Sequence, residues 1–568
     1  FQAEDGIRDV ERSRGLGDVY KRQEDDRLKQ VVELTIGNEG KRTVKAHLKV
    51  RIDSEIYTIS LGKIGPGEKV YSVQIPDIRQ QKKVQFTLSI GEEVQDEVSI
   101  DWNPQRHWLI YIVQGSHHDL GYTDLPQNVL EEHNEFLDSV LRFCDETDDF
   151  PEGSKFKYKI EQSWSVLNYI ENRPKEVVDN LINRILEGRI EVTALYGNEI
   201  TALCGHEELI RLLYPSFRLK RKYGVPIKTA EIDDVPGLTW SLATVLAESG
   251  IKYFTTQLPG WREVKPLGDG PNIYYWSGPD GSRVLFWQSL GGWWDAPIVE
   301  DYNSTYDLLP KALAELEKRG YPFDAICFAV AGGRRDNAPP TVKFSYLAKE
   351  WNSKWAYPKL IIATNTEFFE YLEKKCGEEI KTIRGELTDT DNGVGPLSTA
   401  FHTAMNRVAH DLLLSAEKFC TLAANITDYP YPHKRLTEAY DHILLYDEHT
   451  WGMAGCCGPA QYEHGTEKGL HALKALALAH DALLKSLNKI VDEISLPCKG
   501  YYIVVFNSLS WKRTDVVKAY LRDPPPCGRP MYLRREDEGP PILVSGTALG
   551  RDCLLYTSDA ADELDGVD

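Results

Sequence analysis

Residues 27–101 alternate between apolar and polar positions with a period of two. The alternation is clearest in 31–36, 46–50 and 84–88, and turns rich in Gly and Pro separate these runs. Strands with one buried face have this period, because successive side chains point to opposite faces of a sheet. Short strands at this spacing predict a β-sandwich over residues 27–101. No His, Asp or Glu cluster accompanies the pattern, so we expect an accessory domain without chemistry of its own.

From residue 108 onward, continuous apolar runs alternate with helical patterns. Such runs are typical of strands buried on both faces of a parallel sheet. One helical pattern puts His133, Leu137, Val140 and Cys144 on a single face. The alternation predicts a β/α barrel, or a closely related parallel sheet, over residues 104–375. The candidate strands are 107–115, 157–162, 190–196, 229–234, 253–257, 284–288, 325–331 and 358–363.

The apolar period becomes 3.6 after residue 403, which predicts a helical middle domain over residues 376–495. After Pro497 the period returns to two, with the strand-like run 502–506. We therefore expect a C-terminal β domain over residues 497–550, the start of a β-sandwich. The expected fold class is multidomain, with α/β and β parts.

The two ends of the chain differ in character from the rest. Residues 1–23 and 553–568 resemble translated sequencing adapters more than natural protein sequence. We expect both segments to be non-native and leave them out of the fold prediction. On this reading the natural chain extends beyond both ends.

Composition narrows the function classes. With 568 residues the chain is too long for one hydrophobic core. A net charge of −20 argues against nucleic acid as a partner, since nucleic-acid binders carry a basic face. No apolar stretch approaches the roughly 20 residues of a transmembrane helix. The ten Cys residues include no Cys-x-x-Cys pair, which is more typical of a reducing, cytoplasmic compartment but leaves the localisation open. The oligomeric state is also open.

Polar residues follow three of the candidate strands where each strand ends. His117 and Asp119 follow the first, Asp233 and Asp234 end the fourth, and Asp336 follows the strand 325–331. Barrel enzymes carry their active sites on the rim formed by the carboxyl ends of the strands. Imidazole nitrogen and carboxylate oxygen are both good zinc ligands. The set therefore predicts metal-assisted hydrolysis or transfer of a glycosyl group to water.

Seven motifs in order resemble those of glycoside hydrolase family 38, the class II α-mannosidases. They span roughly residues 106–513, and Asp234-Val-Pro-Gly resembles the nucleophile motif, with Gly250 sixteen positions later (250 − 234). The others are His117-x-Asp119, Gly188-Arg-x-Glu191 with Gly197-Asn-Glu199, Trp276-x-Gly-Pro-Asp-Gly-Ser282, Gly385-Glu-Leu387, Asn406-Arg407 and 505–511.

The resemblance implies a seven-stranded β/α barrel, a three-helix middle domain and trailing β-sandwiches. It also implies one zinc ion, held by His117, Asp119 and Asp234 and binding two adjacent hydroxyls of the sugar. Asp234 would also be the nucleophile of a retaining mechanism, with Asp336 as the acid and base. Retaining glycosidases carry two carboxyl groups about 5 Å apart. The implied activity is hydrolysis of α-glycosidic bonds through a covalent glycosyl-enzyme.

A fourth metal ligand is open between two residues. The family has His-His-Asp followed by Gly, whereas this chain has Tyr-Asp-Glu-His-Thr-Trp-Gly over 446–452. Alignment on the glycine favours Asp447, but the only imidazole is His449, and we expect His449 from its ligand chemistry. The neighbouring acids Asp233 and Asp234 pose a similar choice, which the spacing to Gly250 resolves in favour of Asp234.

Substrate contacts are expected from Tyr122, Asp233, Arg262 and Trp451, with an oligosaccharide, polysaccharide or simpler glycoside as the partner. Tyr122 stands where the family has a Trp that stacks on the sugar. The acid-bearing loop departs from the family pattern, so Asp324 and Asp389 are alternatives to Asp336. Two other functions compete: a zinc-dependent polysaccharide deacetylase, in which a carboxylate activates water, and a non-catalytic carbohydrate-binding protein. The later helical and β domains favour the glycosidase.

Overall fold

The computed structural model describes residues 5–9, 21–24, 27–235, 237–257, 267, 271–289, 296–333, 335–388, 394–451, 458–495, 504–512, 514, 516–520, 531–533, 542–544 and 552–556. The chain divides into two compact units. The first contains Phe1–Arg407 and Tyr440–Leu473, and the second contains Val408–Ala439 and Lys474–Asp568. No helix among the described residues combines the length and apolarity that a bilayer span requires.

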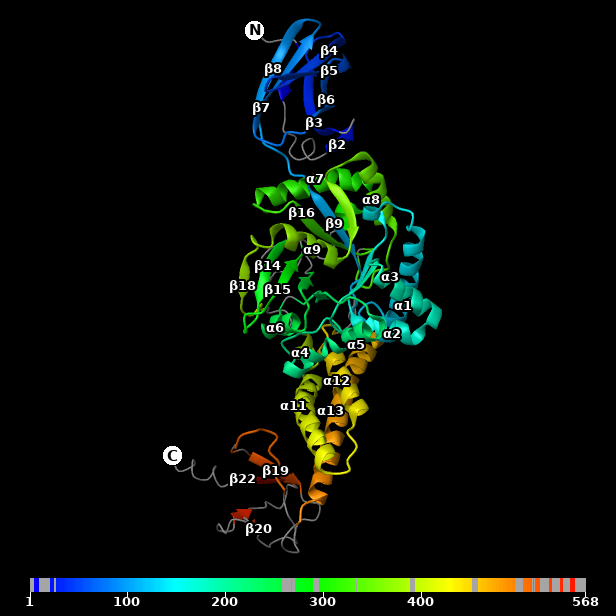
Figure 1. Cartoon of the computed structure of the whole chain (residues 1–568), viewed down its shortest axis with the longest axis vertical. Helices are drawn as coiled ribbons and strands as arrows, with labels where there is room; N and C mark the ends of the chain where they lie inside the picture. The colour runs from blue at the N-terminus through cyan, green and yellow to red at the C-terminus, as the bar shows by residue number, and fades with distance from the viewer. Residues whose placement is uncertain are drawn as a thin grey trace, which may run out of the picture. The chain divides into compact units, whose positions relative to one another are not determined.

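Two antiparallel sheets cover the segment for which the sequence predicts a β-sandwich (Figure 1). Apolar residues from alternate positions of both sheets, among them Leu34, Leu48 and Phe86, are buried in one shared cluster. This is the arrangement that period-two strands produce when two sheets pack face to face. One sheet pairs β3 (Arg27–Asn38) with β6 (Gly67–Pro76), and the other has the order β5 (Glu55–Ile64), β4 (Val44–Ile52), β7 (Lys82–Ile90), β8 (Glu93–Trp102).

The segment 1–23, left out of the fold prediction, contributes two short strands. Both β1 (Asp5–Asp9) and β2, which covers Lys21–Glu24, pair antiparallel with β3. On the side of β3 that faces away from β6, backbone N–H and C=O groups need partners, and any extended segment can provide them. The pairing therefore follows from backbone chemistry and makes no special demand on the sequence of this segment.

Each of the eight strands predicted between residues 107 and 363 is present, and most of these strands are parallel to their neighbours. They form three separate ladders, so a closed seven-stranded barrel stays a prediction. Two further strands were not predicted, namely β14 and β18. The ladders are β16 (Ala325–Val330) with β9 (Leu109–Gln114) and β17 (Lys359–Ala363); β10 (Tyr158–Ile160) with β11 (Ile190–Val192); and β12 (Thr229–Glu231), β13 (Tyr253–Thr256), β15 (Arg283–Gln288), β14 (Asn272–Ser277) and β18 (Thr382–Arg384).

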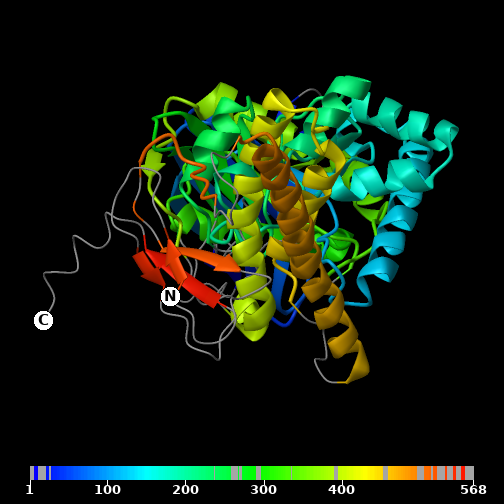
Figure 2. The same cartoon turned by 90° about the horizontal axis from the view of Figure 1, so that it is seen from below.

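Helices follow most of these strands and bury one apolar face against them. In α1 the predicted face of His133, Leu137, Val140 and Cys144 is buried. Figures 1 and 2 show α1, α2 and α3, in cyan, along one flank of this region. The helices are α1 (Pro126–Glu146), α2 (Ser163–Asn172), α3 (Lys175–Leu186), α4 (His206–Arg211), α5 (Tyr214–Tyr223), α6 (Ser241–Glu248), α7 (Tyr302–Lys318), α8 (Lys343–Lys354) and α9 (Asn365–Cys376), with short 3₁₀ turns η1 (Glu152–Ser154) and η2 (Ala296–Val299).

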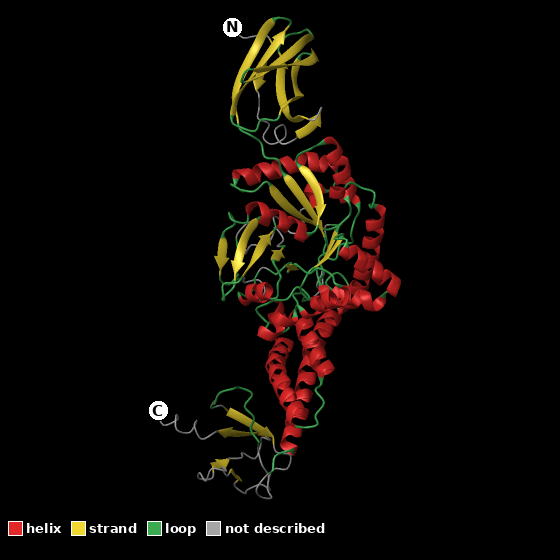
Figure 3. Ribbon diagram, viewed as in Figure 1, coloured by secondary structure: helices red, strands yellow, loops and turns green. Residues whose placement is uncertain are grey.

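Helices also occupy most of the segment predicted as a helical middle domain (Figure 3). Within the second unit, Phe419, Ala423 and Ile490 form a buried apolar cluster. The predicted strand 502–506 is not found where the chain is described, since residues 504–506 have no regular structure. The helices are α10 (Val394–Ser398), α11 (Ala400–Ile426), α12 (His433–Asp447) and α13 (Pro459–Asp492); the later strands pair as β19 (Val516–Tyr520) with β22 (Asp552–Tyr556) and β20 (Met531–Leu533) with β21 (Ile542–Val544). A C-terminal β-sandwich stays a prediction.

Candidate functional site

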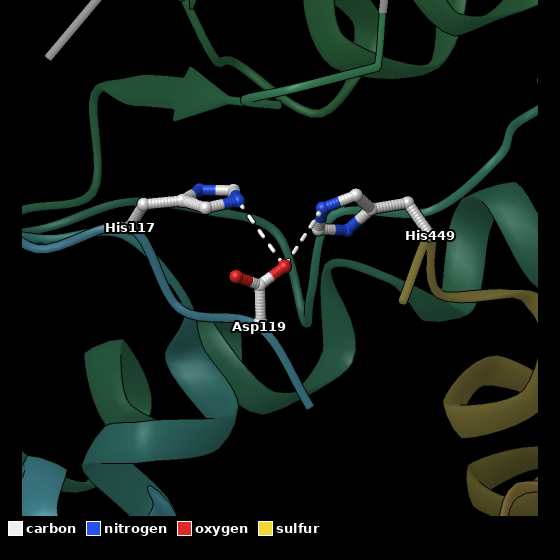
Figure 4. Close-up of side chains that lie close together, drawn as sticks. All are labelled: His117, Asp119 and His449. Atoms are coloured by element: carbon white, nitrogen blue, oxygen red, sulfur yellow. Dashed lines mark ion pairs between the residues drawn. The ribbon is translucent and has the colours of Figure 1, made fainter. Parts of the chain in front are cut away.

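The carboxylate of Asp119 lies between two imidazole rings (Figure 4). Its Oδ1 atom is 3.4 Å from Nε2 of His117 and 3.2 Å from Nε2 of His449. Asp234 completes the group, with its Oδ2 atom 3.8 Å from the same nitrogen of His449. The structure thus brings together four residues that the sequence predicts as metal ligands, from three distant segments of the chain.

Backbone position explains why these segments meet. His117 and Asp119 follow β9, whose side chains Ile110 and Ile112 are fully buried. Asp234 likewise follows the carboxyl end of a strand, β12, which belongs to another ladder. The third segment, immediately after α12, is held by a hydrogen bond from the backbone N–H of His449 to the carbonyl oxygen of Asn198, 2.9 Å long.

Thr450 joins the loops that carry the ligands. Its Oγ1 atom accepts a hydrogen bond from the backbone N–H of Leu120 over 3.0 Å and donates to Oδ1 of Asp119 over 3.3 Å. On the other side, the side-chain oxygen of Asn337 accepts from the backbone N–H of Asp119 over 3.1 Å. The loop after β9 is therefore fixed from both sides.

Each imidazole of the group is oriented by a buried glutamate. Nδ1 of His117 is 3.0 Å from Oε1 of Glu161, and Nδ1 of His449 is 2.6 Å from Oε1 of Glu448. A carboxylate on the outer nitrogen fixes the tautomer of a histidine and turns its Nε2 lone pair toward a metal. Neither glutamate was predicted as a site residue.

Electrostatics in the group follow from these contacts. Burial by itself lowers the pKa of His449, but the carboxylates of Glu448 and Asp119 outweigh it and raise the pKa to about 10. Burial likewise opposes ionisation of Asp119, yet the His117 ring and then His449 hold the pKa of Asp119 well below its usual range. The group therefore carries an ionised carboxylate facing nitrogens that favour positive charge.

These residues fit a divalent cation. Ligand atoms of His117, Asp119 and His449 all lie within 4.8 Å of one another. Oδ2 of Asp119 is buried without a hydrogen-bond partner in the described part of the chain. Two imidazoles with carboxylates are a donor set that zinc accepts. A cation there would replace the proton that the surrounding carboxylates favour on each histidine.

The adjacent acids Asp233 and Asp234 have different surroundings. The side chain of Asp233 is 1% exposed; it accepts hydrogen bonds from Nζ of Lys159 over 3.1 Å and from the backbone N–H of Gln257 over 2.9 Å. Asp234 has a side chain 22% exposed and a φ of 59°, a left-handed conformation that is rare outside glycine. Asp234 lies beside His449, whereas Asp233 joins a buried ionic cluster with Lys159, and its carboxylate also lies within 4.8 Å of ligand atoms of His117 and Glu161.

Asp336 belongs to the electrostatic environment of the same group. Burial raises the pKa of its carboxyl above the usual range, and the negative charge of Asp119, followed by that of Asp234, raises it further. Asp324, an alternative acid, is at the other end of β16, where its backbone carbonyl accepts from Leu109 over 2.8 Å. It is therefore not on the rim, and Asp389, the other alternative, is outside the described residues.

The remaining predicted residues divide into three cases. Asp447 is fully buried and accepts a hydrogen bond from the side chain of Asn406 over 2.7 Å, so it does not join the metal-binding group. Tyr122 is 36% exposed on the loop after β9, and Trp451 is partly buried two residues after His449. Arg262 is outside the described residues.

Sequence reasoning missed Glu161, Glu448 and Asn337. Each was inside a segment already singled out: a predicted strand, the fourth-ligand motif and the acid-bearing loop. The sequence shows only that each is a polar residue near the end of a predicted strand or in a motif already identified. It does not show which metal ligand, if any, the side chain contacts.

Comparisons with known proteins find one matching family and several similar structures. Residues 107–386 match the family described as Glycosyl hydrolases family 38 N-terminal domain. An α-mannosidase from Enterococcus faecalis V583 has a similar structure at 17% identity and a TM-score of 0.61, over 73% of this chain and 46% of that one. A protein in glycosyl hydrolase family 38 from Enterococcus faecalis is similar at 17% identity and a TM-score of 0.54, over 73% and 44%.

At 17% identity the two structures are evidence for a similar fold only. They confirm a mixed α/β, multidomain fold class. This chain spans less than half the length of either structure. A search of curated proteins finds no match.

Proposed function

The chain belongs to glycosyl hydrolase family 38, as its motifs indicated, and from this premise we propose that it is a hydrolase of α-glycosidic bonds that resembles α-mannosidases. The observation that carries the proposal is the meeting of His117, Asp119, His449 and Asp234 around shared oxygen and nitrogen atoms. The α-mannosidase among the similar structures supports the choice of mannosides as the first substrates to test.

Asp234 is the proposed nucleophile. Its side chain is partly exposed, whereas Asp119 and the histidines beside it are buried, so it is the member of the group that a sugar can reach. The left-handed backbone at Asp234 holds its carboxylate beside Nε2 of His449. Attack by this carboxylate on the anomeric carbon would form a glycosyl-enzyme ester, the first half of a retaining mechanism.

Asp336 is the proposed acid and base. A carboxyl that protonates the departing oxygen must hold its proton near neutral pH, and a raised pKa serves this purpose. The direction of the Asp336 pKa supports the role, because burial and the charges of Asp119 and Asp234 all favour the protonated form. In the second half of the reaction, the same carboxylate would take a proton from the attacking water.

His117, Asp119, Asp234 and His449 would hold one zinc ion. When bound, zinc would orient two adjacent hydroxyls of the sugar and stabilise negative charge on their oxygens. Glu161 and Glu448 keep the two histidines in the tautomer that this requires.

Substrate contacts outside the metal group are proposed at Tyr122, which is 36% exposed, and at Trp451, whose ring centroid lies 4.4 Å from Nζ of Lys468. Both are on loops that also carry metal ligands. Asp233 acts through its neighbour, since its buried carboxylate fixes the backbone of Gln257, whose carbonyl oxygen accepts from the N–H of Asp234 over 3.0 Å.

A panel of aryl α-glycosides tests the proposal. We expect release of the aryl group from the α-mannoside, loss of that release after treatment with a chelator, and recovery on addition of zinc. Mass spectrometry after incubation with a fluorinated slow substrate should find the label on Asp234. Release from no member of the panel by the zinc-supplied chain would refute the proposal, and turnover without any labelled residue would favour attack by water, as in the deacetylases.

A further inference from the structure

Asp336 and Asn337 are neighbours on the acid-bearing loop after β16; Asp336 is half-buried and Asn337 is fully buried. We infer that Asn337 is a positioning residue. Its side chain fastens the acid-bearing loop to the loop of Asp119, and so sets where the carboxyl of Asp336 lies relative to the metal ligands. This assignment rests on the proposed function, in which Asp336 is the acid, and it gives Asn337 no contact with substrate.

The amide of Asn337 makes every hydrogen bond that an amide can make. Oδ1 accepts from the backbone N–H of Asp119 over 3.1 Å and from Nε2 of His133 over 3.1 Å. Nδ2 donates to the carbonyl oxygen of Gly121 over 3.0 Å and to Oγ1 of Thr123 over 2.8 Å. Since an asparagine side chain has two acceptor lone pairs and two N–H donors, its capacity is used completely.

These partners allow only one orientation of the amide. A backbone N–H can only donate and a backbone carbonyl can only accept, so Asp119 requires oxygen on one side and Gly121 requires N–H on the other. A carboxylate of the same shape would turn a second acceptor toward the carbonyl of Gly121. Because the side chain of Asn337 is 0% exposed, no water could relieve that mismatch. The position therefore requires an amide.

The backbone of Asn337 contacts the same loop. Its N–H donates to the carbonyl oxygen of His117 over 3.1 Å. Its φ is 49°, in the left-handed region that asparagine adopts more readily than most residues. One residue after the acid, the chain is thus bonded to both residues of the His117-x-Asp119 motif.

Asp336 has Asn337 as its nearest buried anchor. The residue before the acid, Arg335, is exposed. The next close approach is between Gly332 and Pro339, where a Cβ atom on the glycine would collide with the carbonyl oxygen of the proline. A catalytic acid must reach the departing oxygen within hydrogen-bond distance, and a misplacement of about 1 Å can cost roughly 100-fold in rate. Fixing Asn337 is therefore the direct way to fix the acid.

Gln114 provides a comparison within the same pair of loops. It is another buried amide, and it accepts from the backbone N–H of Thr341 over 2.6 Å and donates to the carbonyl oxygen of Thr341 over 3.0 Å. It joins the ends of β9 and β16, as Asn337 joins the loops that follow them, but its partner is five positions from the acid (341 − 336). Loss of Gln114 should weaken the attachment of the loops without acting directly on Asp336.

The test compares an alkyl and a dinitrophenyl α-mannoside, with zinc in excess so that loss of metal does not enter. Asn337→Gly permits the left-handed backbone and removes all four side-chain bonds. We expect kcat for the alkyl mannoside to fall by roughly 10–100-fold, and kcat for the dinitrophenyl mannoside, which needs little protonation, by less than about threefold. The matched control Gln114→Met should leave the ratio of the two rates unchanged.

A double substitution separates positioning from general support of the fold. In the Asp336→Ala background, Asn337→Gly should slow the alkyl mannoside by less than about threefold more, because the acid that it positions is already absent. If Asn337→Gly does not fold, Asn337→Asp replaces it, since aspartate keeps the shape and tolerates the left-handed backbone but lacks the donor to Gly121.

Equal slowing of both mannosides by the Asn337 variant would overturn the assignment, and so would a full further loss in the Asp336→Ala background. Crystal structures of the unaltered and variant chains decide the question without any activity. The carboxyl of Asp336 should be displaced relative to Asp119 by at least about 1 Å in the variant, and an unmoved carboxyl would overturn the assignment. A chain that hydrolyses no glycoside refutes the proposed function instead, and the crystallographic comparison then decides the role of Asn337.

Discussion

The Nδ1 atom of His117 lies 3.0 Å from the Oε1 atom of Glu161, and both side chains are about 1% exposed. The same oxygen accepts hydrogen bonds from the backbone N–H of His118 over 3.1 Å and from the side chain of Asn198 over 2.6 Å. One carboxylate oxygen thus orients a candidate metal ligand and fixes the backbone of the loop that carries it.

Glu161→Ala should therefore weaken zinc binding by roughly 10–100-fold, the usual cost of removing a partner that orients a metal ligand. Glu161→Gln can keep an oxygen at the same position and should lose less. Competition with a chromophoric chelator at fixed pH measures both. Glu135→Ala, an exposed change on α1, is the control, and an unchanged zinc affinity in Glu161→Ala would contradict the assigned role.

The fourth metal ligand can be tested by comparing two nearby substitutions. His449→Ala should reduce the zinc content of the purified protein from about one per chain to a small fraction, because it removes an imidazole of the group. Asp447→Asn should retain most of the zinc, since Asp447 contacts Asn406 instead. Elemental analysis gives the answer, and the reverse order would show that Asp447 is the ligand.

Asp336→Ala should affect substrates according to their leaving groups. Protonation by an acid matters least when the departing group is already a stable anion, so a dinitrophenyl glycoside should retain much of its turnover. An alkyl glycoside should lose most of it, by roughly 10²–10⁴-fold. Added azide should partly restore the dinitrophenyl reaction by replacing the activated water. Equal slowing of both substrates, without rescue, would mean that the acid is another residue.

The raised pKa of Asp336 predicts an alkaline decline in activity on alkyl glycosides. The acid works only when protonated, so turnover should fall as pH rises through its pKa. On a dinitrophenyl glycoside, which needs little protonation, this decline should be much smaller. Profiles of kcat against pH for the two substrates provide the measurement. Identical declines on both substrates would assign the ionisation to a different group.

Glu191 predicts a pH dependence of stability that is separate from the site. Burial raises its pKa from 4.5 to about 7 in the folded chain. The native state therefore binds the proton more tightly, and this contribution is complete below about pH 4.5 and is lost as pH rises through 7. The loss amounts to about 3 kcal/mol. Urea unfolding at pH 5 and pH 8 should show it in the unaltered chain and in exposed Glu176→Gln, but not in Glu191→Gln.

Local patterning was enough to predict most of the strands and the rim positions. The runs that form β9 and β16 are almost entirely apolar because both faces of each strand are buried. A pattern of consecutive apolar residues can be recognised from the sequence alone. His117 and Asp119 were found from the same run, since a polar cluster directly after a buried strand is a local signal. Of the predicted strand 502–506, the described residues 504–506 have no regular structure, since a short apolar run alone does not specify a pairing partner.

The tertiary structure was needed to explain, in physical terms, which of two nearby residues joins the candidate metal site. Asp233 and Asp234 have the same side chain, but Asp234, with a left-handed backbone, lies beside His449, while Lys159 holds Asp233 in the interior. The final turn of α12 directs Asp447 to Asn406, and His449, two residues beyond the helix, reaches Asp119.

The residues that orient the ligands could not be predicted, because their role depends on distances between segments far apart in the chain. Glu161 is an ordinary residue at the end of a strand until β9 and β10 bring it to Nδ1 of His117. The sequence by itself determined which residue types stand at the strand ends. Only folding decided which of their atoms meet, because hydrogen bonds and metal coordination act over about 2–4 Å and no local pattern encodes such a distance.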